Sequence, residues 1–458
     1  MVSAPARRAI LGVLKVRLAL PVPPGRQSVG PTVDRIGGHL RTPLYRNAYA
    51  LILSTGLTSG LGFVYWLAAA RLYPAEVVGL NSAALSALMF LAGLAQFNLA
   101  NVLVRFIPRA GTAALSLNNR ATLVTVVAGL LAGLVFVLGI DIWTPSLAFL
   151  LASPLLVGGF AMATAAWGVF VLQEGVLTGL RRATWVPVRN AVFALGKIAL
   201  LFLFSSLLPD YGMLASWIIA AVLLLGPTGW LVRRQLAAGL PAAPRADDLQ
   251  MNQAQILRYA AADYAGSLAW LAATMLVPVL VSELEGPAAT AHFYLAWTIA
   301  YSLYLVAPGM GSSLIVESAL DPESLGAYSR KALLQTARLV LPLVVVLVLV
   351  APYVLRLLGD SYAVEGTTLV RLLALSAIPN VVNALAISVA RAQRQIVAIV
   401  GILVAQCVSV LVLSFVLLQS VGIVGVGLAW LVSQSAVAAV LLVLRGRLLQ
   451  PAARPSAL

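Results

Sequence analysis

The chain has 458 residues, of which 61% are hydrophobic and only 10% charged, and its formal net charge is +15. Together with a mean hydropathy of +0.98, this composition excludes a water-soluble globular protein and indicates an integral membrane protein. The single cysteine, Cys407, excludes a framework of internal disulfides.

Twelve apolar segments that are long enough to cross a bilayer follow one another along the chain. A membrane-spanning helix needs about 20 apolar residues, and on this basis we expect spans at 48–70, 77–103, 121–141, 147–171, 187–208, 213–233, 259–282, 289–314, 333–355, 368–390, 395–418 and 422–444. The connections between the spans are short and leave no room for a separate catalytic domain. The sequence therefore predicts an all-α polytopic membrane protein.

The basic residues indicate how the chain is oriented. Of the 30 lysines and arginines, all but Arg71, Lys197, Arg356 and Arg371 precede the first span, follow the last span, or lie in or within a few residues of every second gap between spans. Lysine and arginine are retained on the cytoplasmic side during insertion, so we expect both termini in the cytoplasm. This distribution explains the net charge by orientation and by contact with anionic lipid headgroups, and it does not predict binding to nucleic acid.

The spans are expected to form two halves of six. The longest polar interruption in the body of the chain divides them, and it predicts a basic, disordered cytoplasmic tail at 1–45, a six-helix bundle at 46–233, a cytoplasmic linker at 234–258, a second six-helix bundle at 259–447 and a cytoplasmic tail at 448–458. The halves also resemble each other, since Pro74 after span one coincides with Pro287 after span seven. Because six is even, both halves have the same orientation, and we expect a central cavity between them.

Three stretches of the chain carry a resemblance to a known family. They are residues 46–80 around span one, residues 103–109 at the end of span two, and residues 172–190 between spans four and five, followed by Lys197. They resemble the Wzx-type polysaccharide flippases, or polysaccharide biosynthesis proteins, of the multidrug/oligosaccharidyl-lipid/polysaccharide exporter superfamily.

The resemblance implies a function and a location. Such a flippase moves a lipid-linked oligosaccharide, or a related cell-envelope polysaccharide precursor, from the cytoplasmic to the outer leaflet of the plasma (inner) membrane by alternating access. It implies a polyprenyl-diphosphate-linked glycan as substrate within the lipid bilayer, and a polysaccharide polymerase or glycosyltransferases as partners.

Moving a diphosphate through a medium of low dielectric constant requires positive charge in the cavity. Lys197 is the main candidate, because it lies near the middle of span five, where a charged side chain costs about 3 kcal/mol. The alternative is a structural ion pair with Glu174 or Asp263. Arginine donates paired hydrogen bonds to phosphate oxygens, and four arginines near the cytoplasmic side are further candidates, although orientation alone also explains them: Arg105, Arg109, Arg181 and Arg189.

Two carboxylates and a row of aromatic residues complete the predicted site. Asp263 and Glu174 lie at the inner ends of their spans and are candidates for coupling transport to a proton or a sodium ion, or for salt bridges to nearby basic residues. Span eight carries an aromatic stripe at helical spacing, which either stacks against sugars or packs against other helices. The stripe consists of Tyr294, Trp297, Tyr301 and Tyr304.

Other functional classes receive little support from the sequence. Gly196-Lys197-Ile198 lacks the hydroxyl residue of a nucleotide-binding loop. His39 and His292 are far apart and no metal-ligand cluster accompanies either, so we expect no metal, no cofactor and no enzymatic activity. The alternative function is a cation-coupled small-molecule (multidrug) antiporter of the same fold, which predicts an acidic and apolar cavity.

Overall fold

The computed structural model describes residues 59–180, 185–238, 253–320, 325–393 and 395–444. Within these ranges the chain forms α-helices and short 3-10 helices, without a strand. The predicted all-α class is confirmed. The two expected tails and Arg181 lie outside the described residues.

The helices of the first half follow a helical segment at 59–72, which belongs to the first expected span. They are α4 (Ala75–Ala95), α5 (Leu99–Phe106), α6 (Ala114–Leu138), α7 (Ile140–Trp143), α8 (Pro154–Gly179), α9 (Trp185–Leu207) and α10 (Gly212–Ala237), with 3-10 helices η2 (Ile107–Arg109), η3 (Gly111–Ala113) and η4 (Pro145–Leu151).

The helices of the second half begin with α11 (Gln253–Leu284). They continue with α12 (Pro287–Tyr304), α13 (Val306–Leu320), α14 (Leu325–Leu358), α15 (Asp360–Ala392), α16 (Ile396–Val421) and α17 (Ile423–Val443). In the described part of the chain, 11 helical segments are long and apolar enough to cross a membrane. They correspond to expected spans two to twelve, and the segment at 59–72 corresponds to span one.

The structure differs from the expected spans where helices break or continue. The expected span at 77–103 is divided, because Phe97 and Asn98 adopt φ angles of 50° and 59° between α4 and α5. Asparagine tolerates this left-handed conformation better than most residues do. Similarly, the expected span at 289–314 is divided between α12 and α13. Helices α10 and α11 also continue into the segment 234–258, which we expected to be a linker.

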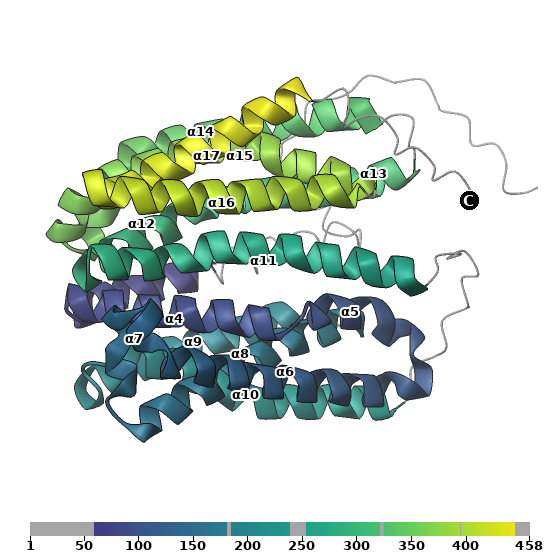
Figure 1. Cartoon of the computed structure of the whole chain (residues 1–458), viewed down its shortest axis with the longest axis horizontal. Helices are drawn as coiled ribbons and strands as arrows, with labels where there is room; N and C mark the ends of the chain where they lie inside the picture. Colours follow the sequence, from purple (N-terminus) through teal and green to yellow (C-terminus); the bar gives the residue numbers. More distant parts are fainter. Residues whose placement is uncertain (1–58, 181–184, 239–252, 321–324, 394, 445–458) are drawn as a thin grey trace, which may run out of the picture. The chain divides into compact units, whose positions relative to one another are not determined.

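The two halves pack against each other through α4, which contacts both α11 and α12 (Figure 1). At the start of α4, a Cβ atom on Gly79 would overlap the main-chain carbonyl of Pro287 at the start of α12. Only glycine fits this close approach of two backbones.

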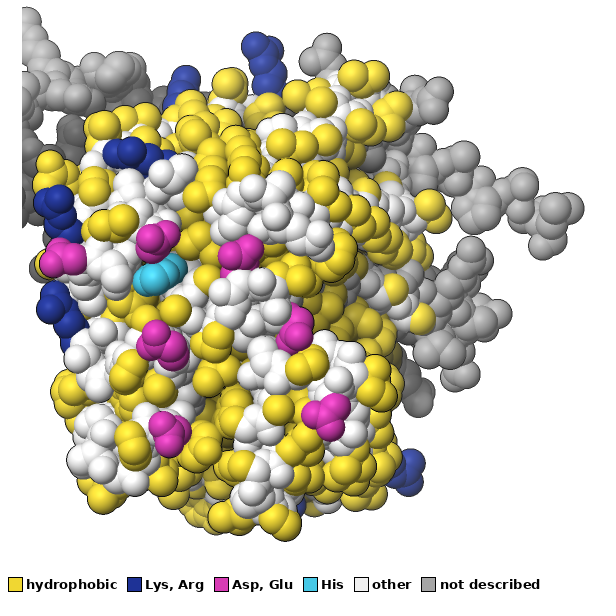
Figure 2. Space-filling view, turned by 60° about the vertical axis from the view of Figure 1, so that its left-hand side comes forward, with side chains coloured by type: hydrophobic (Ala, Val, Ile, Leu, Met, Phe, Trp, Pro, Cys, Tyr) yellow, Lys and Arg dark blue, Asp and Glu magenta, His cyan; other side chains and the backbone are white. Residues whose placement is uncertain are grey.

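Acidic side chains gather at the end of the helices shown in Figure 2. Here Arg71 of the first half donates hydrogen bonds from Nε to the carbonyl of Leu357 (2.9 Å) and from Nη2 to that of Arg356 (3.4 Å). These carbonyls belong to the last turn of α14, where the helix dipole favours a cation. The main-chain N–H of Ser146 in η4 also donates to Glu283 of α11 (3.0 Å). Contacts between the halves thus occur at the end predicted to be outside.

Candidate functional site

Two cavities adjoin at α11. The first, of about 400 Å³, lies between α4, α5 and α8 of the first half and α11 of the second half. The second, of about 330 Å³, lies between α11, α12, α13 and α15. Ser267 and Trp270 of α11 line both cavities. One helix therefore carries the wall that the two cavities share.

The first cavity is lined by amide side chains from the break between α4 and α5. Gln96, Asn98 and Asn101 all belong to its lining, together with Tyr264 of α11. Asn101 donates to Asn98 Oδ1 (2.6 Å), and Asn98 donates in turn to Asp263 Oδ2 on α11 (3.4 Å). Interrupted backbone at membrane depth is tolerated where it is buried in protein or lines a cavity. The helix break therefore places neutral hydrogen-bonding groups at the boundary between the halves.

The second cavity has aromatic walls and one arginine. Trp270, Tyr301 and Tyr304 line it, and so do Asn380 and Arg391 of α15. We call the following rings the C-terminal aromatic cluster: Trp270, Trp297, Tyr301, Tyr304 and Trp430. Their ring centroids lie between 4.5 Å (Trp297–Trp430) and 6.4 Å (Trp270–Tyr304) apart in the contacting pairs.

The predicted stripe on span eight has two environments. Tyr301 and Tyr304 line the second cavity. Tyr294 and Trp297 are buried among other rings. The ring centroid of Tyr294 lies 4.8 Å from that of Trp66 in the first half. The geometry suits the first pair for contact with a ligand and the second pair for packing.

Lys197 lies within a second group of rings, the N-terminal aromatic cluster, which consists of Tyr65, Trp66, Trp167, Phe170, Phe193 and Trp217. Its Nζ atom lies 3.4 Å from the ring centroid of Trp217 and 4.4 Å from that of Tyr65. A cation over aromatic faces is attracted by their negative charge density. Lys197 is only 5% exposed, and within the described residues it forms no ion pair, so the alternative pairing with Glu174 or Asp263 is not found.

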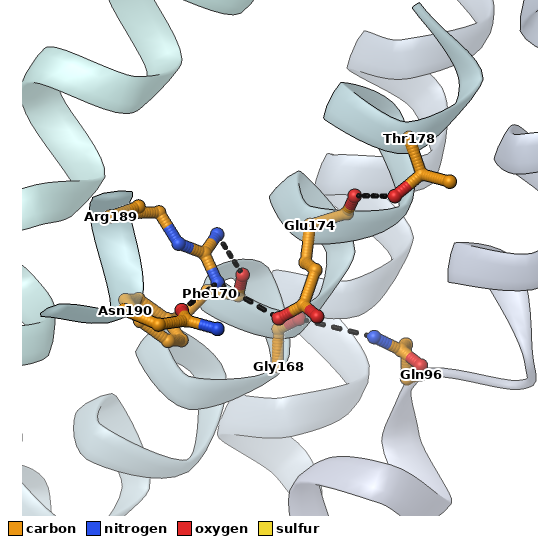
Figure 3. A network of polar contacts seen from close by, with 7 residues as sticks. All are labelled: Gln96, Gly168, Phe170, Glu174, Thr178, Arg189 and Asn190. Carbon is orange, nitrogen blue, oxygen red and sulfur yellow. Dashed lines mark hydrogen bonds and ion pairs between the residues drawn. The ribbon is translucent and has the colours of Figure 1, made fainter. Parts of the chain in front are cut away.

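Glu174 pairs instead with Arg189, as Figure 3 shows. Arg189 Nη2 donates to Glu174 Oε2 (3.1 Å), and Nη1 donates to the carbonyl of Phe170 (3.0 Å). The guanidinium carbon also lies 3.9 Å from the centroid of the Phe170 ring. Arg189 is buried, whereas the Glu174 side chain is 43% exposed. These contacts tie α9 to α8.

The remaining predicted basic residues are not brought together by the structure. Arg105 is exposed at the end of α5 and lines neither cavity. Arg109 belongs to η2, and its side chain lies outside the described residues. Neither Lys197 nor Arg189 lines either cavity. The roles predicted for these residues in substrate binding stay predictions.

Sequence reasoning missed several residues that line the cavities, namely Gln96, Asn98, Asn101, Asn380 and Arg391. The amides carry a usable signal, because polar side chains are costly within apolar spans and are retained there for contacts or function. Arg391 carries no such signal, since its position near the cytoplasmic end of a span is explained by orientation alone. The part of the chain that the structure describes holds no group of three or more metal-ligating side chains.

Comparison with known families gives one match. The family model described as polysaccharide biosynthesis protein matches residues 44–322, which include the whole described first half and the beginning of the second. No curated protein sequence matches the chain.

Solved structures share the fold. A multidrug resistance MATE family transporter of the MOP superfamily, in an inward-facing conformation, is 16% identical with a TM-score of 0.65, over 85% of this chain and 94% of that chain. The lipid II flippase MurJ, in an inward closed conformation, is 12% identical with a TM-score of 0.62, over 86% and 87%. A MOP superfamily transporter from Pyrococcus furiosus Vc1 (DSM3638) is 14% identical with a TM-score of 0.59, over 87% and 95%. At these identities the likeness concerns the fold.

Proposed function

The chain belongs to the polysaccharide biosynthesis protein family, and from this membership we propose that it flips a lipid-linked oligosaccharide, or a related cell-envelope polysaccharide precursor, from the cytoplasmic to the outer leaflet. It is a multi-pass membrane protein with the fold of MOP superfamily transporters. In this proposal it works in the plasma membrane by alternating access, together with a polysaccharide polymerase or glycosyltransferases.

Within the structure, the chemistry of the two adjoining cavities supports the proposal. Aromatic rings offer flat apolar faces, and amide groups such as those of Asn101 and Asn380 donate and accept hydrogen bonds. Sugars have apolar faces bordered by hydroxyl groups, so rings and amides together suit them. Arg391 adds a fork of donors that matches a phosphate.

The diphosphate of the carrier requires more than one cation in this proposal. Arg391 contacts it in the second cavity, while Arg105, Arg109 and Arg181 attract it from the cytoplasm. Lys197 lies one layer of rings behind the first cavity, because Trp167 lines that cavity and its ring centroid is 6.2 Å from that of Trp217. We propose that Lys197 becomes accessible in another state of the transport cycle.

The alternative function is a cation-coupled multidrug antiporter, which is supported by the shared fold with a MATE transporter. The antiporter predicts a cavity that is both acidic and apolar. Among the described residues that line the two cavities, none is acidic, and one is an arginine. Asp263 reaches the first cavity only through its hydrogen bond with Asn98. The lining therefore favours an anionic, glycan-bearing substrate.

The test replaces Trp270, which lines both cavities, and Arg391, which is proposed to contact the phosphate. In a host strain that lacks its own copy of the protein, we expect Trp270→Leu and Arg391→Gln each to lower the surface polysaccharide about tenfold or more. A loss of one charge-assisted hydrogen bond of 1.5–3 kcal/mol corresponds to about this factor. Protein level in the membrane is measured in parallel.

Two matched variants serve as controls. Trp185→Leu changes an exposed tryptophan on α9, and Arg338→Gln changes an exposed arginine on α14, and neither residue lines the cavities. Both should leave export near the unmodified level. Unchanged export in Trp270→Leu and Arg391→Gln, combined with a loss of resistance to cationic dyes, would replace the flippase by the antiporter.

A further inference from the structure

A third cavity lies within the first half and belongs to neither of the cavities at α11. It is a groove of about 660 Å³ between α6, α8 and α10. Trp230, which is part of its lining, is 62% exposed, so the groove opens on the outer surface of span six, which we expect to face the bilayer. Occupants that reach this groove therefore come from the membrane.

The groove has space because glycine residues form part of its wall. A Cβ atom added to Gly226 of α10 would have no other atom within 4 Å. A Cβ atom on Gly229 would lie 3.3 Å from Gln173 Nε2. Both glycines belong to the lining. Their missing side chains leave room for a ligand.

The floor of the groove is polar, which is unusual for a surface in contact with lipid. Asn118, Thr122 and Gln173 line it. Gln173 is only 8% exposed, and its Nε2 donates to the carbonyl of Leu225 (3.1 Å), whereas its Oε1 is buried without a hydrogen-bond partner. Unsatisfied polar groups in hydrocarbon are costly, so a groove of this kind favours a polar occupant over acyl chains alone.

The mouth of the groove is strongly basic. Arg233 and Arg234 line it in the last turns of α10, at the end predicted to be cytoplasmic. The guanidinium of Arg234 lies 5.4 Å from the ring centroid of Trp230. Tryptophan and arginine together are typical of the level of the lipid headgroups.

The second half has an equivalent groove, which supports the interpretation. It lies between α14, α15 and α17, which are spans nine, ten and twelve, whereas α6, α8 and α10 are spans three, four and six. Its volume is about 520 Å³, and Ser329 and Arg330 belong to its lining. Its other walls are apolar, with residues such as Leu385 and Leu441. An arginine thus lines both grooves, but only the first has a polar floor.

We propose that the groove between α6, α8 and α10 binds an anionic phospholipid of the cytoplasmic leaflet. Arg233 and Arg234 hold the lipid phosphate, the polar floor faces the glycerol region, and the acyl chains continue along the apolar surface of the helices. Arginine binds phosphate through paired charge-assisted hydrogen bonds, and basic residues near the cytoplasmic surface attract anionic lipids. The lipid is a ligand of the folded protein and is distinct from the transported substrate.

The test measures binding of phosphatidylglycerol to the purified full chain by native mass spectrometry, with phosphatidylcholine of the same acyl chains as the neutral comparison. We expect phosphatidylglycerol to bind more tightly. The double variant Arg233→Gln/Arg234→Gln should weaken its binding about 25-fold, because each arginine contributes a factor of about five. Arg120→Gln is the control, since it removes an exposed arginine of α6 that does not line the groove.

A second variant tests the groove without changing charge. Gly226→Leu fills the open space, and we expect it to lower phosphatidylglycerol binding while thermal unfolding stays near that of the unmodified protein. Equal binding of both lipids, or the same loss in Arg120→Gln as in the double variant, would overturn the proposal. So would displacement of phosphatidylglycerol by a much lower concentration of polyprenyl phosphate, because the groove would then belong to the substrate carrier.

Discussion

The two aromatic clusters occupy related places in the two halves but enclose different chemistry. Trp430 stands 213 residues after Trp217, the separation that also relates Pro287 to Pro74. Lys197 stands 20 residues before Trp217, and the residue 20 positions before Trp430 is Val410, which is fully buried. The first half thus holds a cation against its tryptophan, whereas the second half has an apolar side chain at the equivalent position.

The two clusters also differ in which of their rings line a cavity. In the second half, Tyr301 and Tyr304 line a cavity. In the first half, the ring that lines a cavity is Trp167, and the cation lies behind it. We infer that the aromatic framework is the common element and that the first half adds a buried cation to it, which the equivalent position of the second half lacks.

The largest effect is expected when a cation is placed in the second half. Val410→Lys buries an ammonium group for which the apolar surroundings provide no carboxylate, and we expect it to cost about 5 kcal/mol. The thermal unfolding of the purified variant in detergent measures this loss. If Val410→Lys unfolds at the same temperature as the unmodified protein, the second cluster can hold a cation as well as the first, and the contrast disappears.

Replacing the two related tryptophans measures how much the contact with Lys197 contributes to the stability of the first cluster. Trp217→Leu and Trp430→Leu both lose ring packing, which costs about 2 kcal/mol, but only Trp217→Leu also loses the contact with Lys197, which adds about 2 kcal/mol. A double-mutant cycle with Lys197→Met isolates the second contribution. We expect coupling between Lys197 and Trp217 and none between Lys197 and Trp430, and equal coupling would contradict the assignment.

A smaller effect is expected for Lys197→Met alone. Methionine keeps the length of the side chain and removes the charge, so the variant loses about 2 kcal/mol of cation–π attraction but also the cost of keeping an ammonium group buried without a carboxylate, and we expect little net change in the free energy of unfolding. Under the proposed function, surface polysaccharide falls while protein level is maintained. Export at the unmodified level would show that the lysine serves the fold only.

The smallest change concerns Glu174. Glu174→Gln removes the ion pair with Arg189, but the carboxylate is partly exposed and Arg189 keeps its bond to the Phe170 carbonyl, so we expect a cost of about 1 kcal/mol. Asp263→Asn is the matched variant at the other predicted coupling residue. Dependence of export on a proton or sodium gradient that is lost in Glu174→Gln, and retained in Asp263→Asn, would assign coupling to Glu174 despite its ion pair.

The sequence predicts the spans well because their signal is additive over many residues. Hydropathy over about 20 positions is insensitive to any one side chain, and the alternation of basic gaps fixes the orientation. The break at Phe97 and Asn98 was not predicted, because it depends on local hydrogen bonds and on the contact with Asp263, which belongs to the other half.

The site was predicted less completely than the fold, for a related reason. The depth of Lys197 in span five follows from its position, and Phe193 lies four residues before it on the same helix, but Tyr65 and Trp217 come from other helices, so spacing along one helix does not indicate them. Arg391 was assigned to orientation, which explains it equally well without a cavity. The surroundings of Lys197 and of Arg391 both depend on which distant segments pack together, and this is not visible in the sequence of one helix.

The contact between Gly79 and Pro287 limits how the transporter can change state. Backbone meets backbone at this point, so no side chain of Gly79 is present that could change its rotamer to absorb a displacement. The two halves therefore either rotate about this contact, which would act as a pivot, or separate at it completely. In the second case the hydrogen bonds of Arg71 with the end of α14 must also break, and the outer end opens in one cooperative step rather than gradually.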